Sequence, residues 1–122
     1  MPQGNLTYRR GQIHWVRLDP TIGAEAQKTR SCLIVQNDVM NQYGQLTVVI
    51  PFRPGVKLAP YTVNVKATTI NGLDKDRFLD IGQIRSVDGQ RILGQVGVLE
   101  PDYWQQIRTA LELVLGFSTL DE

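Results

Sequence analysis

Several residue types are scarce in this sequence, and each scarcity excludes a class of site. The 122 residues include one cysteine, Cys32, and one histidine, His14. A lone cysteine forms no internal disulfide, which favours a reducing compartment, so we expect a cytoplasmic protein. One thiol and one imidazole make a Cys/His metal site within the chain unexpected. A serine hydrolase triad would depend on His14 alone, and we expect neither a metal nor a cofactor.

Long apolar runs and the common nucleotide motifs are absent as well. No stretch approaches the roughly 18 apolar residues that a membrane span requires, and the polar residues 1–10 lack a signal-peptide pattern. We therefore expect no membrane association. The sequence contains no Walker loop, GxGxxG or HExxH motif, so the usual nucleotide-cofactor and zinc enzymes are poorly supported.

The net charge is only +1, so overall electrostatics does not indicate a nucleic-acid-binding protein. The type of basic residue is more informative, because nine of the 13 Lys and Arg residues are arginine. Arginine's planar guanidinium suits bidentate contacts with phosphate. The alternative is that most of these arginines are solvated surface charges.

Strand patterns dominate the residues that are present. Alternating or β-branched apolar runs predict strands over residues 12–18, 32–36, 46–52, 61–66, 79–87 and 96–99. The run at 32–36 is continuous and predicts a central strand that is buried on both faces. Residues 41–44 read as a turn between the second and third strands. In the first strand we expect Trp15 to pack in the core, and we expect the same of Tyr43 in the turn.

The end of the chain changes to helical spacing. Pro101 suits the first position of a helix, and Gly116 suits its C-terminal end. The apolar stripe between them is expected to pack in the core or in a dimer (Trp104, Ile107, Leu111, Val114, Leu115). We predict one domain over residues 1–122, mainly β, built as a small SH3-like barrel of mostly antiparallel strands with a C-terminal α-helix.

A long polar loop is predicted inside this β protein. Residues 19–29 join two strands, about twice the usual hairpin length. Long loops on a rigid sheet often carry binding and catalytic residues. A plain surface loop is the alternative, and the pattern of residues does not decide between the two.

Several segments of the sequence are similar to the sequence pattern of one known family. RGQI at 10–13, LDPTIGAE at 18–25, TR at 29–30, LIVQND at 33–38 and QIRSVD at 83–88 follow one another in order. Together with Asn41, Arg91-Ile92, Leu99 and the final helix, they resemble the MazF/PemK family of toxin endoribonucleases, which shares its barrel with CcdB proteins. The resemblance covers about residues 9–117.

The resemblance implies a fold, a reaction and partners. The fold is the CcdB/PemK-type barrel, working as a homodimer. The reaction is sequence-specific, metal-independent cleavage of single-stranded RNA, commonly mRNA, in which a ribose 2′-hydroxyl attacks the adjacent phosphate. The products are a cyclic phosphate and a 5′-hydroxyl. The protein would be the toxin of a type II toxin–antitoxin pair, inhibited by a MazE-like antitoxin.

The resemblance also implies site residues. Arg30 would be catalytic, stabilising negative charge on the phosphate and helping proton transfer. Glu25 could orient Arg30 or contact a base, while a salt bridge from Arg30 to Glu25 or Asp19 is the structural alternative. For His14, RNA contact and a structural role both stay open, and for Trp15 and Tyr43 stacking on RNA bases is the alternative to core packing. The other residues expected to contact RNA are Gln27, Lys28, Thr29, Gln83 and Arg85.

One departure from the family pattern concerns catalysis. The family carries Thr or Ser after the third strand, whereas this chain has Arg53 in the segment Pro51-Phe52-Arg53. Arg53 would add a second catalytic cation, or it would leave a weakened RNA-binding protein. A further alternative on the same fold is a CcdB-like inhibitor of DNA gyrase, which acts through its C-terminal helix. For the homodimer we expect contacts from that helix and from residues 83–87.

Overall fold

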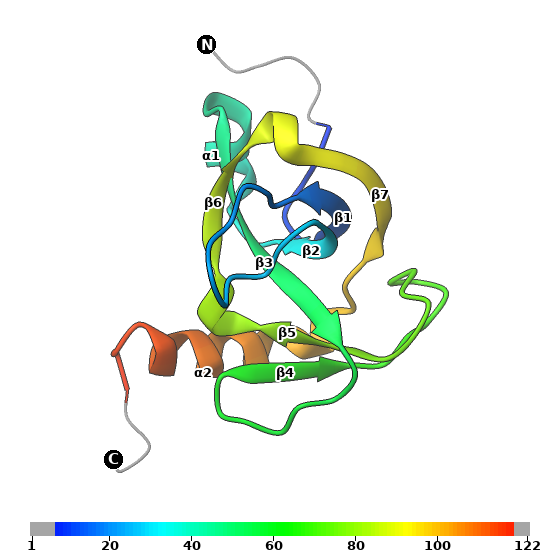
Figure 1. Ribbon diagram of the computed structural model, residues 1–122, viewed down its shortest axis with the longest axis vertical. Helices are drawn as coiled ribbons and strands as arrows, with labels where there is room; N and C mark the ends of the chain where they lie inside the picture. Colours follow the sequence, from blue (N-terminus) through cyan, green and yellow to red (C-terminus); the bar gives the residue numbers. More distant parts are fainter. Residues whose placement is uncertain (1–6, 119–122) are drawn as a thin grey trace.

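The computed structural model describes residues 7–118, which form one strongly curved, antiparallel sheet with helices at its margins (Figure 1). The strand order is β4-β5-β3-β2-β1-β7, and β6 pairs with β3. The strands are β1 (Gln12–Arg17), β2 (Thr29–Ile34), β3 (Leu46–Pro54), β4 (Thr62–Val65), β5 (Arg77–Asp80), β6 (Arg85–Asp88) and β7 (Ile92–Val98). The predicted mainly β fold with a C-terminal helix is confirmed.

Strand β2 lies in the middle of the sheet, between β1 and β3. Its residues Cys32, Leu33 and Ile34 are all fully buried, although alternate residues of a strand face opposite sides of the sheet. Both faces of β2 are therefore covered, as the continuous apolar run predicts.

Two apolar clusters cover the two faces of β2. The larger contains Leu33 and receives Ile107 and Ala110 from helix α2 (Trp104–Val114), which lies beside β4 at the lower end of Figure 1. The smaller contains Cys32 and Ile34 and lies against β6 and the β1–β2 loop. Along β2 from Ile34 and Cys32 toward the loop, every second residue therefore points to the face that this smaller cluster covers.

The Arg-Gly motif at the start of β1 has a structural role. Gly11 adopts a φ of +90°, which only glycine tolerates readily. In this conformation its N–H donates to the Ile34 carbonyl at 2.9 Å, and its own carbonyl accepts from the Leu99 N–H at 2.9 Å. Gly11 thus joins the end of β2 to the segment that follows β7.

Helix α2 begins and ends close to the predicted residues. A single 3-10 turn, η3 (Pro101–Tyr103), precedes it. Gly116 has a φ of +81°, and the N–H groups of Gly116 and Phe117 donate to the carbonyls of Leu113 and Glu112. These two bonds form a Schellman motif, which satisfies carbonyls that the helix end leaves without an intrahelical partner.

Two predictions of local structure were wrong. The expected turn at residues 41–44 belongs to a short helix, α1 (Asp38–Tyr43), because the side chain of Asn37 accepts the Met40 N–H and caps it. The single strand expected at 79–87 is divided into β5 and β6 by a 3-10 turn, η1 (Ile81–Gln83), which lets the chain pair with two different parts of β3.

The expected core positions of two aromatic residues were also wrong. Trp15 is 46% exposed and Tyr43 is 60% exposed. Alternation of apolar residues identifies a face of a strand, but it does not tell whether that face is covered along its whole length.

Within residues 7–118, no helix is both long and apolar enough to cross a membrane.

Candidate functional site

The long loop between β1 and β2 is closed at its base by the backbone. The Leu18 N–H donates to the Lys28 carbonyl at 2.9 Å, and Lys28 itself has an unusual positive φ of 67°. The Asp19 carboxylate accepts from the Lys28 N–H and from the Thr21 hydroxyl, and these bonds lower the pKa of Asp19. The base of the loop is thus a compact turn whose one carboxylate stays ionised.

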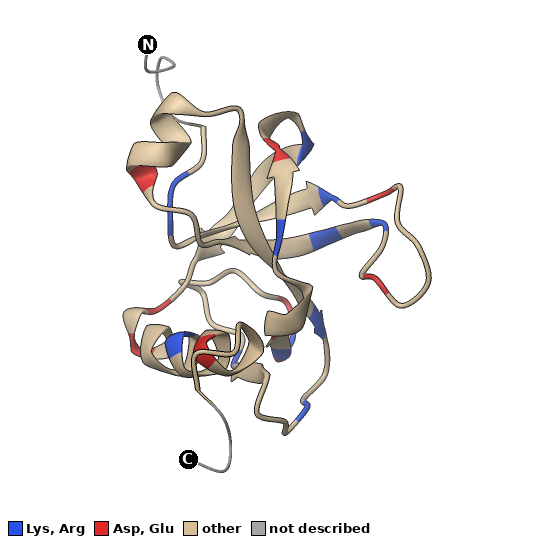
Figure 2. Cartoon of the chain, turned by 90° about the vertical axis from the view of Figure 1, so that its left-hand side faces the viewer, with Lys and Arg blue, Asp and Glu red and all other residues tan. Residues whose placement is uncertain are grey.

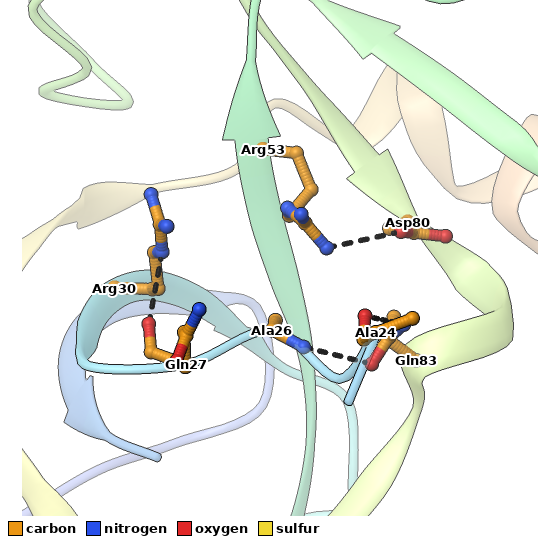
Figure 3. A network of polar contacts seen from close by, with 7 residues as sticks. All are labelled: Ala24, Ala26, Gln27, Arg30, Arg53, Asp80 and Gln83. Carbon is orange, nitrogen blue, oxygen red and sulfur yellow. Dashed lines mark hydrogen bonds and ion pairs between the residues drawn. The ribbon is translucent and has the colours of Figure 1, made fainter. Parts of the chain in front are cut away.

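Side chains from the segment between β5 and β7 hold the same loop from the side. The Gln83 amide accepts from the Ala26 N–H at 3.2 Å and donates to the Ala24 carbonyl at 3.4 Å (Figure 3). Arg85 donates to the Leu18 carbonyl at 3.4 Å, and Arg91 donates to the carbonyls of Arg17 and Asp19. The QIR segment therefore fixes the loop that carries the family-like motif.

The central feature of the site is a pair of arginines on neighbouring strands. The pairing of β2 with β3 ends at Cys32 and Pro51, and Arg30 and Arg53 each lie two residues beyond that pair, on the face to which Cys32 and Pro51 belong. Figure 3 shows both side chains on the same side of the two strands. Two positive charges therefore lie on one face, beside the loop.

Each guanidinium is held by a single contact. The Nε of Arg30 donates to the Gln27 carbonyl at 3.1 Å, while Nη1 of Arg53 lies 3.6 Å from Oδ2 of Asp80 on β5. Within the described part of the chain, neither side chain makes another hydrogen bond or ion pair. The remaining N–H groups of both arginines are therefore available to an anion such as a phosphate.

The buried thiol of Cys32 shows how far the positive charge extends. Burial raises the pKa of Cys32 to about 12, while Arg85 and Arg30 oppose this increase. Val49 of β3 pairs with Ile34 of β2 on one side and with Arg85 of β6 on the other. Arg85 therefore lies on the same face of the sheet as Ile34 and Cys32. With Arg53 they form a group of three arginines, which we call the arginine face (Arg30, Arg53, Arg85). Figure 2 shows blue, basic positions along the strands that lead into the loop.

The other predicted RNA-contacting residues have different positions. Thr29 begins β2 and is exposed, as are Gln27 and Lys28 in the loop. Glu25 accepts the Ile22 N–H at 2.6 Å and makes no contact with Arg30, so the structure supports neither the orienting role nor the salt bridge. Glu25 also lines a pocket of about 430 Å³ together with Gln83 and Arg85.

His14 pairs with Cys32 across β1 and β2, so it lies on the same face of the sheet as Arg30, but it is buried. It is 2% exposed, and its ring nitrogens contact the Leu93 carbonyl and Oε1 of Gln12, each at 2.9 Å. These contacts occupy both nitrogens. Of the two roles left open, His14 has the structural one, and we leave it out of the RNA-contacting set.

Among residues 7–118, no group of three or more His, Cys, Asp or Glu side chains is arranged to hold a metal ion. The chemistry that the site offers is cationic: guanidinium N–H donors that can bind a phosphate and stabilise charge that develops on it.

A family model described as PemK-like, MazF-like toxin of type II toxin–antitoxin system matches residues 9–115. The chain belongs to the PemK/MazF-like toxin family. Among its relatives, the endoribonuclease MazF of Staphylococcus epidermidis is 29% identical over 93% of this chain and 95% of the relative. The endoribonuclease EndoA of Bacillus subtilis is 25% identical over 91% of this chain and 97% of the relative.

Solved structures show the same fold. A MazF from Deinococcus radiodurans gives a TM-score of 0.75 at 22% identity, covering 89% of this chain and 96% of the other. A mycobacterial endoribonuclease in complex with its cognate antitoxin gives a TM-score of 0.74 at 20% identity, covering 92% and 98%. The predicted resemblance to the PemK/MazF-like family is confirmed.

Two residues that contribute to the site were not predicted from the sequence to do so. Asp80 pairs with Arg53, and Arg91 binds carbonyls at the base of the loop. The sequence signal for Asp80 was a charged residue between the apolar residues Leu79 and Ile81. Its partner depends on the pairing of β5 with β3, which the sequence pattern does not give. The resemblance led us to expect Thr or Ser at position 53, so it does not account for Arg53 either.

Proposed function

We propose that this protein is the toxin of a type II toxin–antitoxin pair and that it cuts single-stranded RNA, commonly mRNA in the cytoplasm. The observation that carries the proposal is the placement of Arg30 and Arg53 on the same face of neighbouring strands, each with N–H groups that no other described residue occupies. The family match and the relatives named as endoribonucleases support the reaction, and they favour it over gyrase inhibition.

The proposed reaction is an internal transfer at one phosphate and needs no metal. The 2′-oxygen of a ribose loses its proton and bonds to the adjacent phosphorus. The bond from phosphorus to the 5′-oxygen then breaks, and that oxygen gains a proton. The products are a 2′,3′-cyclic phosphate and a 5′-hydroxyl. Arg30, together with Arg53, stabilises the negative charge on the phosphate oxygens in the transition state.

The RNA strand would lie along the arginine face and the exposed part of the loop. Gln27, Lys28 and Thr29 are exposed there and offer polar contacts, and Arg85 adds positive charge. Gln83 contributes indirectly because both ends of its amide bind the loop. Glu25 lines the same pocket as Arg85, and we infer that it contacts a base there.

The proposal includes two protein partners. The solved relatives include a mycobacterial endoribonuclease with its cognate antitoxin and MazE–MazF complexes from Deinococcus radiodurans. We infer a MazE-like antitoxin and a homodimer for this chain. Helix α2 borders an apolar groove of about 500 Å³ that includes the exposed Leu115 and Phe117, whereas Val87 of the expected strand contact is buried. Sedimentation of the purified protein tests the dimer.

The main test uses a long transcript, the wild-type protein and two variants. We expect the wild type to release fragments with 5′-hydroxyl ends, and Arg30→Ala to cut about a hundredfold more slowly or worse. The control is Arg9→Ala, which removes an exposed arginine that lies outside the site and should cut like the wild type. Equal rates for Arg30→Ala and the wild type would remove the assigned role of Arg30.

A second candidate function is favoured by Arg53 itself. The family pattern has Thr or Ser at this position, so the natural protein would bind RNA with little turnover if the hydroxyl is indispensable. Arg53→Thr separates the two candidates. A cleaving wild type that loses activity in Arg53→Thr supports Arg53 as a catalytic cation, whereas a silent wild type with a cleaving variant supports the weakened RNA-binding protein.

A further inference from the structure

The side chain of Asp80 has no evident structural task. It precedes the 3-10 turn η1, but its carboxylate makes no capping hydrogen bond there. Within residues 7–118 its one polar contact is with Arg53, at 3.6 Å, and the two side chains are 19% and 30% exposed. Partly exposed ion pairs of this kind contribute little to stability, so a purely structural role explains little.

The pairing of β3 with β5 fixes the relative position of the two residues. Phe52 pairs with Leu79 and Arg53 pairs with Phe78, so Asp80 is the diagonal neighbour of Arg53 on the same face of the sheet. Long side chains reach such diagonal neighbours. The backbone of Arg53 is therefore paired within the sheet, and the contact with Asp80 restricts the Arg53 side chain, which has many rotamers when free.

We propose that Asp80 is a positioning residue that holds the guanidinium of Arg53 for contact with the phosphate bound by Arg30. Figure 3 shows Arg53 between the strand that carries Arg30 and the strand that carries Asp80. This inference rests on the proposed function, and it gives this chain a pair, Arg53 and Asp80, where the family pattern has one hydroxyl residue.

A carboxylate so close to a phosphate site has an opposing electrostatic effect. It lowers the net positive charge that an RNA phosphate meets, so on charge alone its removal strengthens binding. Its removal also frees Arg53 to adopt other rotamers, which weakens the alignment that the transition state needs. Removal of Asp80 therefore impairs the alignment of Arg53 but strengthens RNA binding. A general loss of structure would impair both, so the two effects can be distinguished.

The experiment compares Asp80→Asn, Asp80→Glu and Asp80→Asn combined with Arg53→Ala. The cleavage site is first mapped on a long transcript, and a short oligonucleotide of that sequence is used for single-turnover rates. The same sequence with 2′-O-methyl riboses, which cannot be cut by the proposed reaction, gives the dissociation constant. Asp74→Asn is the matched control because it breaks the Asp74–Arg77 pair, and Arg77 points to the opposite face of β5 from Asp80 and Arg53.

We expect Asp80→Asn to lower the cleavage rate about tenfold through misalignment of Arg53, while the dissociation constant falls or stays within about twofold. Asp80→Glu should restore most of the rate because it keeps the carboxylate. In the Arg53→Ala background, Asp80→Asn should have no further effect, since the group that it positions is gone.

Three results would overturn the proposal: a wild-type rate in Asp80→Asn, a full additional loss in the Arg53→Ala background, or an equal loss in Asp74→Asn. If the wild type cuts no RNA, the proposed reaction fails, and the oligonucleotide with 2′-O-methyl riboses still tests the positioning of Arg53. In that case positioning requires Asp80→Asn to change the dissociation constant by a larger factor when Arg53 is present than in the Arg53→Ala background, and an equal change in both backgrounds contradicts it.

Discussion

Around Asn41 the polar side chains are enclosed and bond to one another, whereas on the arginine face they point outward with donors left free. Asn41 is 1% exposed and Thr47 is fully buried. The Asn41 side-chain oxygen accepts from Gln36 at 2.9 Å and from Thr47 at 2.7 Å, and its nitrogen donates to the Gln36 carbonyl and to Asp38 at 3.1 Å. Every donor and acceptor of the amide is used.

The two regions lie at opposite ends of the same two strands, so the contrast is informative. At one end, bonds within the Asn41 cluster (Gln36, Asp38, Asn41, Thr47) hold α1 against β2 and β3. At the other end, Arg30 and Arg53 each have one contact and no further partner among the described residues. Buried polar groups must be fully bonded because an unsatisfied one is costly, while groups that serve a ligand must keep donors free.

The largest effect on stability is expected from a substitution within the Asn41 cluster. Asn41→Ala removes a fully bonded amide and leaves Gln36 and Thr47 buried with fewer partners. We expect the free energy of unfolding to fall by about 2–4 kcal/mol. Urea denaturation measures this change. The cleavage rate per folded molecule should stay at the wild-type value, and a selective loss of catalysis without loss of stability would contradict the contrast.

On the arginine face, a substitution should lower the cleavage rate strongly and change stability little. Arg30→Ala, which we expect to lower the cleavage rate about a hundredfold, should change the free energy of unfolding by no more than about 0.5 kcal/mol, since its one side-chain hydrogen bond is at a partly exposed site. The same urea titration provides the measurement. A destabilisation as large as that of Asn41→Ala would mean that Arg30 is a structural residue.

The smallest effect is expected at the boundary between the arginine face and the core. The Cys32 thiol is fully buried, and its pKa is raised to about 12 by burial despite the neighbouring arginines. Alkylation requires the thiolate, so iodoacetamide at pH 8 should leave the folded protein unlabelled and label it once urea unfolds the chain. Mass spectrometry provides the readout, and rapid labelling of the folded protein would show that the site opens to solvent.

Local patterns were sufficient for much of the fold. The apolar run at 32–36 identified a strand covered on both faces, and helical spacing with Gly116 identified the last helix and its end. The patterns failed at residues 41–44 and 79–87. In the first case an Asn cap starts a helix, and in the second a 3-10 turn interrupts an apolar stretch, because a change of pairing partner on β3 leaves little trace in composition.

By itself, the sequence determined the strand content, the buried β2, the C-terminal helix and the motif segments that identify the family. These depend on side chains within a few residues of one another, where periodicity and turn chemistry act directly. Only the tertiary structure decided that Arg30 and Arg53 share a face, that Gln83 holds the loop, that His14 is enclosed and that Asp80 contacts Arg53. Those relations depend on strand register between residues distant in the chain, which arises when the whole sheet packs and which local spacing does not encode.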